Sequence, residues 1–111
     1  MKMTLGQHQE AFTRDLVKLL TKAFELGYEV RCGELERPLM MQEYYVKVGR
    51  SKTLRSNHAS KTAIDIHMMK DGKLCYPPEL GEYWESLNPL NRWGGNFKSL
   101  KDGPHFERNV N

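Results

Sequence analysis

Two short stretches of this 111-residue chain carry side chains that could bind a metal. "SNHASKTAIDIH" contains His58 and Asp65, and "DGPHFE" contains Asp102 and His105. Imidazole nitrogen and carboxylate oxygen are both zinc ligands, and a catalytic zinc takes three protein ligands and leaves one position for water. His58, Asp65 and His105 are therefore a chemically sensible ligand set. Asp102 could take a proton from the bound water and pass it to a leaving amine.

Each of these residues also has an ordinary interpretation. His58 could be a solvated loop histidine, Asp65 a strand-end carboxylate in a salt bridge, and His105 a packed strand histidine. Asp102 could cap the turn that follows it. His67 is expected on the same strand face as Asp65, but a fourth ligand would exclude the water, so we expect His67 to lie beside the site or at the surface.

The segment after the first histidine alternates as a β-strand does. Ile64, Ile66 and Met68 are expected to face the core, so Asp65 is expected to face the other side of the sheet, towards a cleft. Asp71-Gly72 is a turn signal, which predicts a hairpin of "TAIDIHMMK" and "KLCY". "YEVRCGEL" and "GPHFERN" are expected to be further strands, "GRSKTLRSNHASK" a long loop and "NPLNRWGGNF" turn-rich.

Helices are expected at three places. Apolar side chains recur at helical intervals over residues 4 to 26, with Thr4 as the N-cap and Gly27 ending the helix. Pro38 fits the first turn of a second helix, "PLMMQEYYVKV", and a short third helix follows Pro77-Pro78. Together the elements predict an α+β fold, with helices packed on one face of a small, mainly antiparallel sheet and the metal site in a cleft on the sheet.

Composition bounds the class of protein. Fractions of 39% hydrophobic and 28% charged residues predict one soluble globular domain over residues 1–111. No apolar run could span a bilayer, and the N-terminus lacks the pattern of a secretory signal, so we expect synthesis in the cytoplasm. Cys32 and Cys75 lack CxxC spacing and are expected to be reduced, buried strand residues. The net charge of +3 favours an anionic partner, such as a bacterial cell wall or nucleic acid.

Four segments resemble those of a known family, and they occur in the family's order. "SNHASKTAID" resembles the SxHxxGxAxD motif of the LAS-type zinc peptidases, which include VanY-like D-alanyl-D-alanine carboxypeptidases and phage L-alanyl-D-glutamate endolysins. "DGPHFE" resembles the second motif, (D/E)xxH, and "RWGGNF" resembles the Trp-Gly-Gly segment between the two motifs. "GELERPLMMQEYYVKVGRSKTLRSNH" resembles the approach to the first motif. The similarity covers residues 33–107 approximately.

The resemblance implies a role for each matching residue. It implies that zinc is bound by His58, Asp65 and His105. It makes Asp102 the general acid/base, and an aspartate there resembles the endolysin branch, whereas the carboxypeptidases tend to have glutamate.

The remaining candidates contact the substrate or support the ligands. Ser56 and Gln42 match motif residues and are expected to bind substrate. Arg37 is expected to polarise the scissile carbonyl or to hold a substrate carboxylate. Trp93 either lines the cleft as a substrate-binding residue or is a packed structural tryptophan. Glu107 either orients a ligand histidine or is solvated.

One position departs from the family motif, because Lys61 replaces its glycine. A positive φ at that turn would strain a lysine. Since the spacing of the ligands is intact, we expect the loop to follow a different path.

The function implied is that of a zinc-dependent peptidase that cleaves the stem peptide of bacterial peptidoglycan. An L-alanyl-D-glutamate endopeptidase acting as a phage or prophage endolysin is expected, monomeric and reaching the wall through a holin. The alternatives are a D-alanyl-D-alanine carboxypeptidase of the same family and a non-catalytic wall-binding or phage structural domain. Nucleic-acid binding through "KVGRSKTLR" rests on charge alone, and no nucleic-acid or membrane partner is expected.

Overall fold

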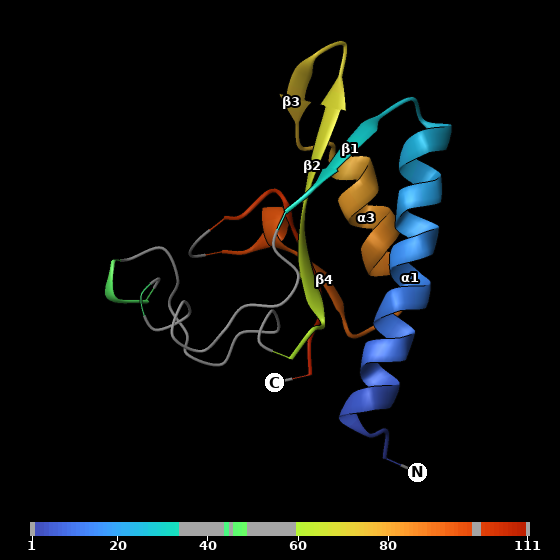
Figure 1. Ribbon diagram of the computed structural model, residues 1–111, viewed down its shortest axis with the longest axis vertical. Helices are drawn as coiled ribbons and strands as arrows, with labels where there is room; N and C mark the ends of the chain where they lie inside the picture. Colours follow the sequence, from blue (N-terminus) through green and yellow to red (C-terminus); the bar gives the residue numbers. More distant parts are fainter. Residues whose placement is uncertain (1, 34–43, 45, 49–59, 99–100, 111) are drawn as a thin grey trace.

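A computed structural model describes residues 2–33, 44, 46–48, 60–98 and 101–110. Its described part is a five-stranded antiparallel sheet with two helices on one face (Figure 1). The elements in chain order are α1 (Leu5–Glu25), β1 (Glu29–Cys32), β2 (Ala63–Lys70), β3 (Lys73–Cys75), α3 (Pro78–Leu87), β4 (Asn91–Trp93), the 3-10 turn η1 (Gly94–Asn96) and β5 (His105–Arg108). The predicted α+β fold is confirmed. Neither described helix is both long and apolar enough to cross a membrane.

Strand β2 is the centre of the sheet. The strand order is β1-β2-β5-β4, and β3 pairs with the end of β2. The first part of β2 pairs with β5, where Ala63 lies opposite Glu107 and Asp65 lies opposite His105. The later part pairs with β1 and, through the turn at Asp71-Gly72, with β3. Both turn residues have positive φ, 52° and 75°, as a tight hairpin requires.

Helix α1 has the signals that its sequence predicted at both ends. Thr4 and Gln7 form a reciprocal capping box, in which each side chain accepts a hydrogen bond from the other residue's backbone N–H. Gly27 follows the helix with φ 87°, a conformation that glycine adopts without strain. Phe12, Leu19 and other residues of one face are buried, so the helix is held by an apolar stripe.

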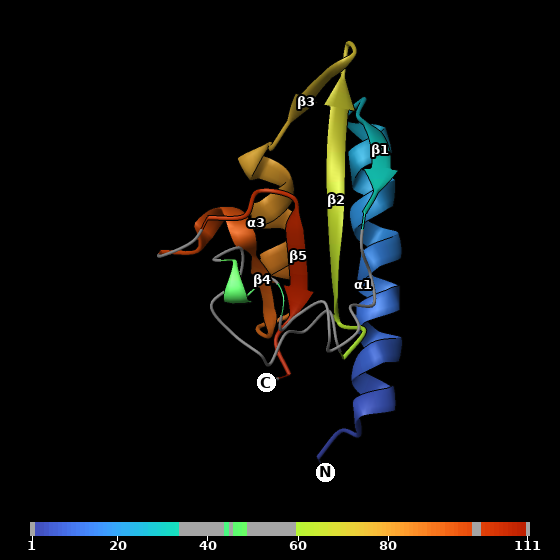
Figure 2. The same cartoon turned by 60° about the vertical axis from the view of Figure 1, so that its left-hand side comes forward.

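The core lies between the helices and the sheet, and Trp84 of α3 is at its centre. The Trp84 ring meets Phe12 of α1 edge-on at 5.6 Å and Phe106 of β5 edge-on at 6.0 Å. Its indole N–H donates a hydrogen bond to the backbone carbonyl of Glu107 at 2.9 Å. Figure 2 shows both helices on the same side of the sheet. Because side chains alternate along a strand, Phe106 faces the helices, whereas His105 and Glu107 face the opposite side.

Three predictions need correction or lie outside the description. Cys32 and Cys75 are free strand residues as predicted, but Cys32 is exposed and Cys75 only half-buried, because most residues of β1 and β3 are exposed. Strand β4 was predicted to be a turn-rich segment. Most of the predicted second helix lies outside the described residues, although Tyr44 is helical and accepts a hydrogen bond from the Val48 N–H.

Candidate metal centre

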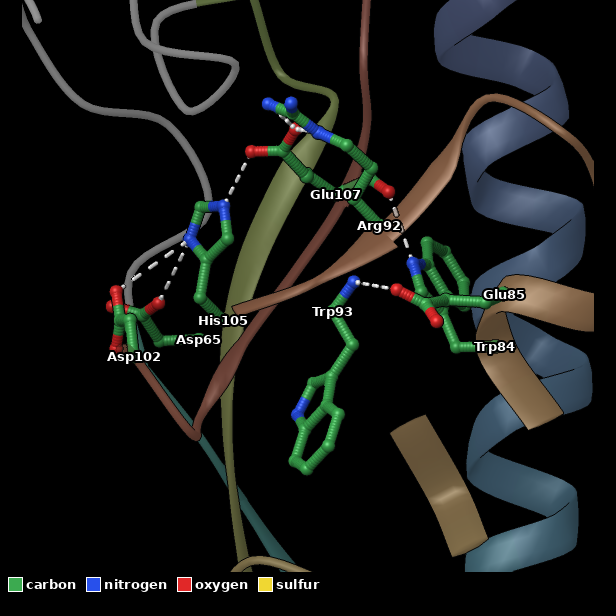
Figure 3. A network of polar contacts seen from close by, with 8 residues as sticks. All are labelled: Asp65, Trp84, Glu85, Arg92, Trp93, Asp102, His105 and Glu107. Atoms are coloured by element: carbon green, nitrogen blue, oxygen red, sulfur yellow. Dashed lines mark hydrogen bonds and ion pairs between the residues drawn. The ribbon is translucent and has the colours of Figure 1, made fainter. Parts of the chain in front are cut away.

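Asp65, Asp102 and His105 come together on the face of the sheet opposite α1 and α3 (Figure 2). Asp65 and His105 are register partners on β2 and β5, and opposite residues of an antiparallel pair point to the same face. The His105 Nδ1 atom lies 3.6 Å from Asp65 Oδ1 and 3.9 Å from Asp102 Oδ2 (Figure 3). The three residues each offer one ligand atom, and all three atoms lie within 4.8 Å of one another.

The turn before β5 holds Asp102 in place. The His105 N–H donates to the Asp102 carbonyl at 3.0 Å, and the Asp102 N–H donates to the Gly94 carbonyl at 2.9 Å. A Cβ atom on Gly94 would lie 2.1 Å from the Asp102 carbonyl oxygen and 2.8 Å from the His105 Cβ. The first glycine of "RWGGNF" is therefore required by the close approach of this backbone to the turn that carries Asp102.

Trp93 supports the same turn from inside the molecule. It is only 6% exposed, and Cβ atoms on Gly81 or Gly95 would lie within 2.4 Å of its ring. The indole N–H donates to the Gly103 carbonyl at 2.8 Å, next to Asp102. This enclosure favours the structural alternative for Trp93 over the predicted contact with substrate.

The second nitrogen of His105 has its own partner. The Nε2 atom lies 2.7 Å from Glu107 Oε1, and Glu107 is only 4% exposed. Arg92 of β4 donates to the other carboxylate oxygen, Oε2, from Nε at 2.7 Å and from Nη2 at 2.6 Å. Glu107 is thus buried beside the histidine rather than solvated.

Sequence reasoning missed Arg92 in this arrangement. Glu107 could be placed beside His105, because residues two apart on a strand share a face. The pairing of Arg92 with Glu107 depends on the register of β4 against β5, and β4 itself was not expected.

The charges around His105 control its protonation in the metal-free protein. Burial alone would lower the pKa of His105, but its contacts with Asp65 and Glu107, and the charges of Glu107 and Asp102, outweigh burial and raise the pKa to about 9. Burial would likewise raise the pKa of Glu107, but His105 and Arg92 outweigh it and lower that pKa. The imidazole therefore lies in a strongly negative environment, which attracts a proton or another cation.

These donors fit a zinc ion. Zinc binds imidazole nitrogen and carboxylate oxygen at about 2.0–2.2 Å, so two ligands at a tetrahedral angle lie about 3.4 Å apart. The 3.6 Å between Asp65 Oδ1 and His105 Nδ1 is close to that separation. His67 is half-buried on the same strand face but does not belong to this three-residue group of described residues.

Four of the predicted site residues lie outside the described part of the chain: Arg37, Gln42, Ser56 and His58. The description resumes at Ser60, whose carbonyl accepts a hydrogen bond from the Gln9 side chain of α1 at 2.9 Å. The next residue, Lys61, has φ 58°. The expectation of a different loop path is therefore wrong at this residue: the left-handed conformation that suits the motif glycine is present, and a lysine adopts it.

Comparison with known proteins agrees with this geometry. The sequence profile of a peptidase M15 family, described as D-alanyl-D-alanine carboxypeptidase, matches residues 49–108, more than half of the chain. The chain belongs to this family, the LAS-type metallopeptidases, which confirms the resemblance. It is thus a peptide-bond hydrolase.

A solved structure extends the similarity beyond that profile. The L-Ala D-Glu endopeptidase ChiX of Serratia marcescens is 28% identical, with a TM-score of 0.67, over 86% of this chain and 79% of that one. A search of curated proteins found no significant match.

Proposed function

We propose that the protein is a zinc-dependent endopeptidase that cleaves the stem peptide of bacterial peptidoglycan between L-alanine and D-glutamate. The observation that carries the proposal is the meeting of Asp65, Asp102 and His105 on the face of the sheet opposite α1 and α3. The similarity to an L-Ala D-Glu endopeptidase supports the choice of bond. The family profile, described as a carboxypeptidase, keeps removal of a terminal D-alanine as the second candidate.

His58, Asp65 and His105 would hold the zinc. A zinc bound in such a site lowers the pKa of a coordinated water to about 7 and polarises the scissile carbonyl. Arg37 would donate to the oxyanion that develops on that carbonyl. Ser56 and Gln42 would orient the peptide through hydrogen bonds.

Asp102 would move the proton. Its side chain is 46% exposed against 23% for Asp65, so Asp102 has the better access to water and to a substrate. Its carboxylate would take a proton from the attacking water and donate it to the nitrogen of the leaving amine. The turn that hydrogen-bonds to Gly94 keeps this carboxylate beside the ligand histidine.

A phage or prophage endolysin is the biological role that we propose. An aspartate at position 102 resembles that branch of the family, and a net charge of +3 suits an anionic wall. In this role the chain is made in the cytoplasm, reaches the wall through a holin and acts as a monomer.

The test is muropeptide mass spectrometry after digestion of purified peptidoglycan by the zinc-loaded protein. Cleavage between L-alanine and D-glutamate is expected, with activity lost in His58→Ala. Loss of one terminal alanine instead would establish the carboxypeptidase. No product from the wild type would favour a non-catalytic wall-binding domain. Asp71→Asn, at the exposed hairpin turn, is the matched control and should keep full activity.

A further inference from the structure

The two nitrogens of the His105 ring face groups on opposite sides (Figure 3). Nδ1 faces the carboxylates of Asp65 and Asp102, whereas Nε2 lies 2.7 Å from Glu107 Oε1. A carboxylate only accepts hydrogen bonds, so Nε2 carries a proton in this contact and donates it to Glu107. When the imidazolium gives up one proton, the contact with Glu107 keeps the proton on Nε2, so the nitrogen left with a lone pair for a metal is Nδ1.

The two carboxylate oxygens of Glu107 have different partners, Arg92 and His105. Both contacts from the guanidinium, at 2.7 and 2.6 Å, go to Oε2, so Oε1 is available to His105. Arg92 and Glu107 are register partners on β4 and β5, so the backbone pairing keeps the two side chains together. A carboxylate that is only 4% exposed needs such partners to stay ionised.

Phe97 connects the far side of Arg92 to the same histidine. The Arg92 guanidinium lies 5.4 Å from the centre of the Phe97 ring, and that ring lies 5.6 Å from the His105 ring. The Phe97 N–H donates to the Gly94 carbonyl at 3.1 Å, which fixes the start of this segment. His105, Glu107, Arg92 and Phe97 thus form a closed ring of contacts, and rotation of the imidazole would break at least one of them.

We infer that Glu107, held by Arg92, is a positioning residue that fixes the tautomer and orientation of His105 and so presents Nδ1 to the metal before the metal binds. The inference rests on the proposed function, because it requires that His105 is a ligand. Partners of this kind are worth about 10–100-fold in metal affinity in other proteins. A purely structural role would be different: Glu107 would join β4 to β5 and affect stability but not the affinity for zinc.

The test uses Glu107→Gln, which keeps the size of the side chain and an oxygen that can accept from Nε2–H but removes the charge. Zinc affinity, measured by competition with a chromophoric chelator, is expected to fall about 10–100-fold. In Arg92→Lys, which keeps the positive charge but loses the planar guanidinium, zinc affinity is expected to fall less, by about 3–10-fold. The matched controls are Glu82→Gln and Arg14→Lys, both exposed on helices, and they should bind zinc as the wild type does.

A second measurement separates positioning from stability. Long-range proton–nitrogen NMR of the zinc-loaded wild type should show His105 protonated at Nε2 and metal-bound at Nδ1. Binding through Nε2 would overturn the inference, and so would Glu107→Gln with wild-type affinity and an intact fold. If Glu107→Gln does not fold, the affinity of Arg92→Lys decides, and a wild-type value contradicts the inference. A wild type that binds no zinc would refute the proposed function itself, whereas wild-type affinity in the variants would refute only this inference.

Discussion

Asp65 and His105 are opposite residues of the β2–β5 pair, and their Oδ1 and Nδ1 atoms lie 3.6 Å apart. Asp102 reaches the same imidazole from the turn before β5, at 3.9 Å, with a side chain twice as exposed as that of Asp65. The register of the sheet therefore fixes one carboxylate and a turn fixes the other. This difference in support underlies the different roles that we propose for the two aspartates.

Substitution of each carboxylate should distinguish the role of Asp65 from that of Asp102. Asp65→Asn is expected to weaken zinc binding at least about 100-fold, because an amide is a much poorer ligand than a carboxylate. Asp102→Asn is expected to keep zinc within about threefold but to lose about 100- to 10,000-fold in peptidase rate, since it removes the proton carrier. Chelator competition and muropeptide release measure the two effects. Equal loss of zinc in both variants would make Asp102 a ligand.

Metal-free protein should lose stability as the pH rises past neutrality. The pKa of His105 is about 9 in the fold against 6.5 for an ordinary histidine, so its protonation stabilises the fold fully below pH 6.5. This contribution, on the order of 3 kcal/mol at most, is lost as the pH rises through 9. Urea unfolding in the presence of a chelator measures the change. His105→Gln is the control, and an equally steep loss in that variant would contradict the prediction.

Lys61→Gly should stabilise the protein. The φ of 58° is strained for lysine and relaxed for glycine, and the gain exceeds the entropy that glycine loses on folding. We expect the free energy of unfolding to rise by about 0.5–1 kcal/mol, and the melting temperature by roughly 2–6 °C. Lys18→Gly, on the exposed face of α1, is the matched control and should lose about 1 kcal/mol. A loss in both variants would mean that contacts of Lys61 outweigh its backbone strain.

Gly94→Ala should damage the site through the backbone. The new Cβ would lie 2.1 Å from the Asp102 carbonyl oxygen, so the turn must move, and overpacking of this kind costs about 1–3 kcal/mol. A displacement of about 1 Å at Asp102 is expected to lower the peptidase rate about 100-fold. Thermal unfolding and muropeptide release measure the two effects. In the control Gly6→Ala, in the first turn of α1, the new Cβ would meet nothing closer than 3.9 Å. The stability and the peptidase rate of this variant should be unchanged or improved.

The sequence was most informative where structure is set locally. The capping residue Thr4, the turn at Asp71-Gly72 and the alternation of Ile64 and Ile66 depend on neighbours within a few residues, and all three were predicted correctly. The positions of Asp65, Asp102 and His105 followed from two motifs, and the structure brings these three together.

What the sequence missed depends on long-range pairing. Strand β4 has three residues, too few for a periodic pattern, and it forms because β5 pairs with it. The contact of Arg92 with Glu107 is a consequence of that pairing. The exposure of Cys32 follows from the edge position of β1, and the left-handed backbone at Lys61 is imposed by the fold against the preference of the residue.

Helix α1 precedes the segment that the family profile matches, yet it is part of the same folding unit. Phe12 packs against Trp84, and the Gln9 side chain donates a hydrogen bond to the Ser60 carbonyl within the first motif. Arg108, at the end of β5, donates from Nε to His8 Nδ1 at 3.0 Å. A fragment restricted to residues 49–108 would lack the contact of Phe12 with the Trp84 ring. It would also lack the α1 hydrogen bonds to Ser60, before β2, and to Arg108, at the end of β5. The folding unit is therefore larger than the segment that the family profile matches, and it includes the N-terminal helix.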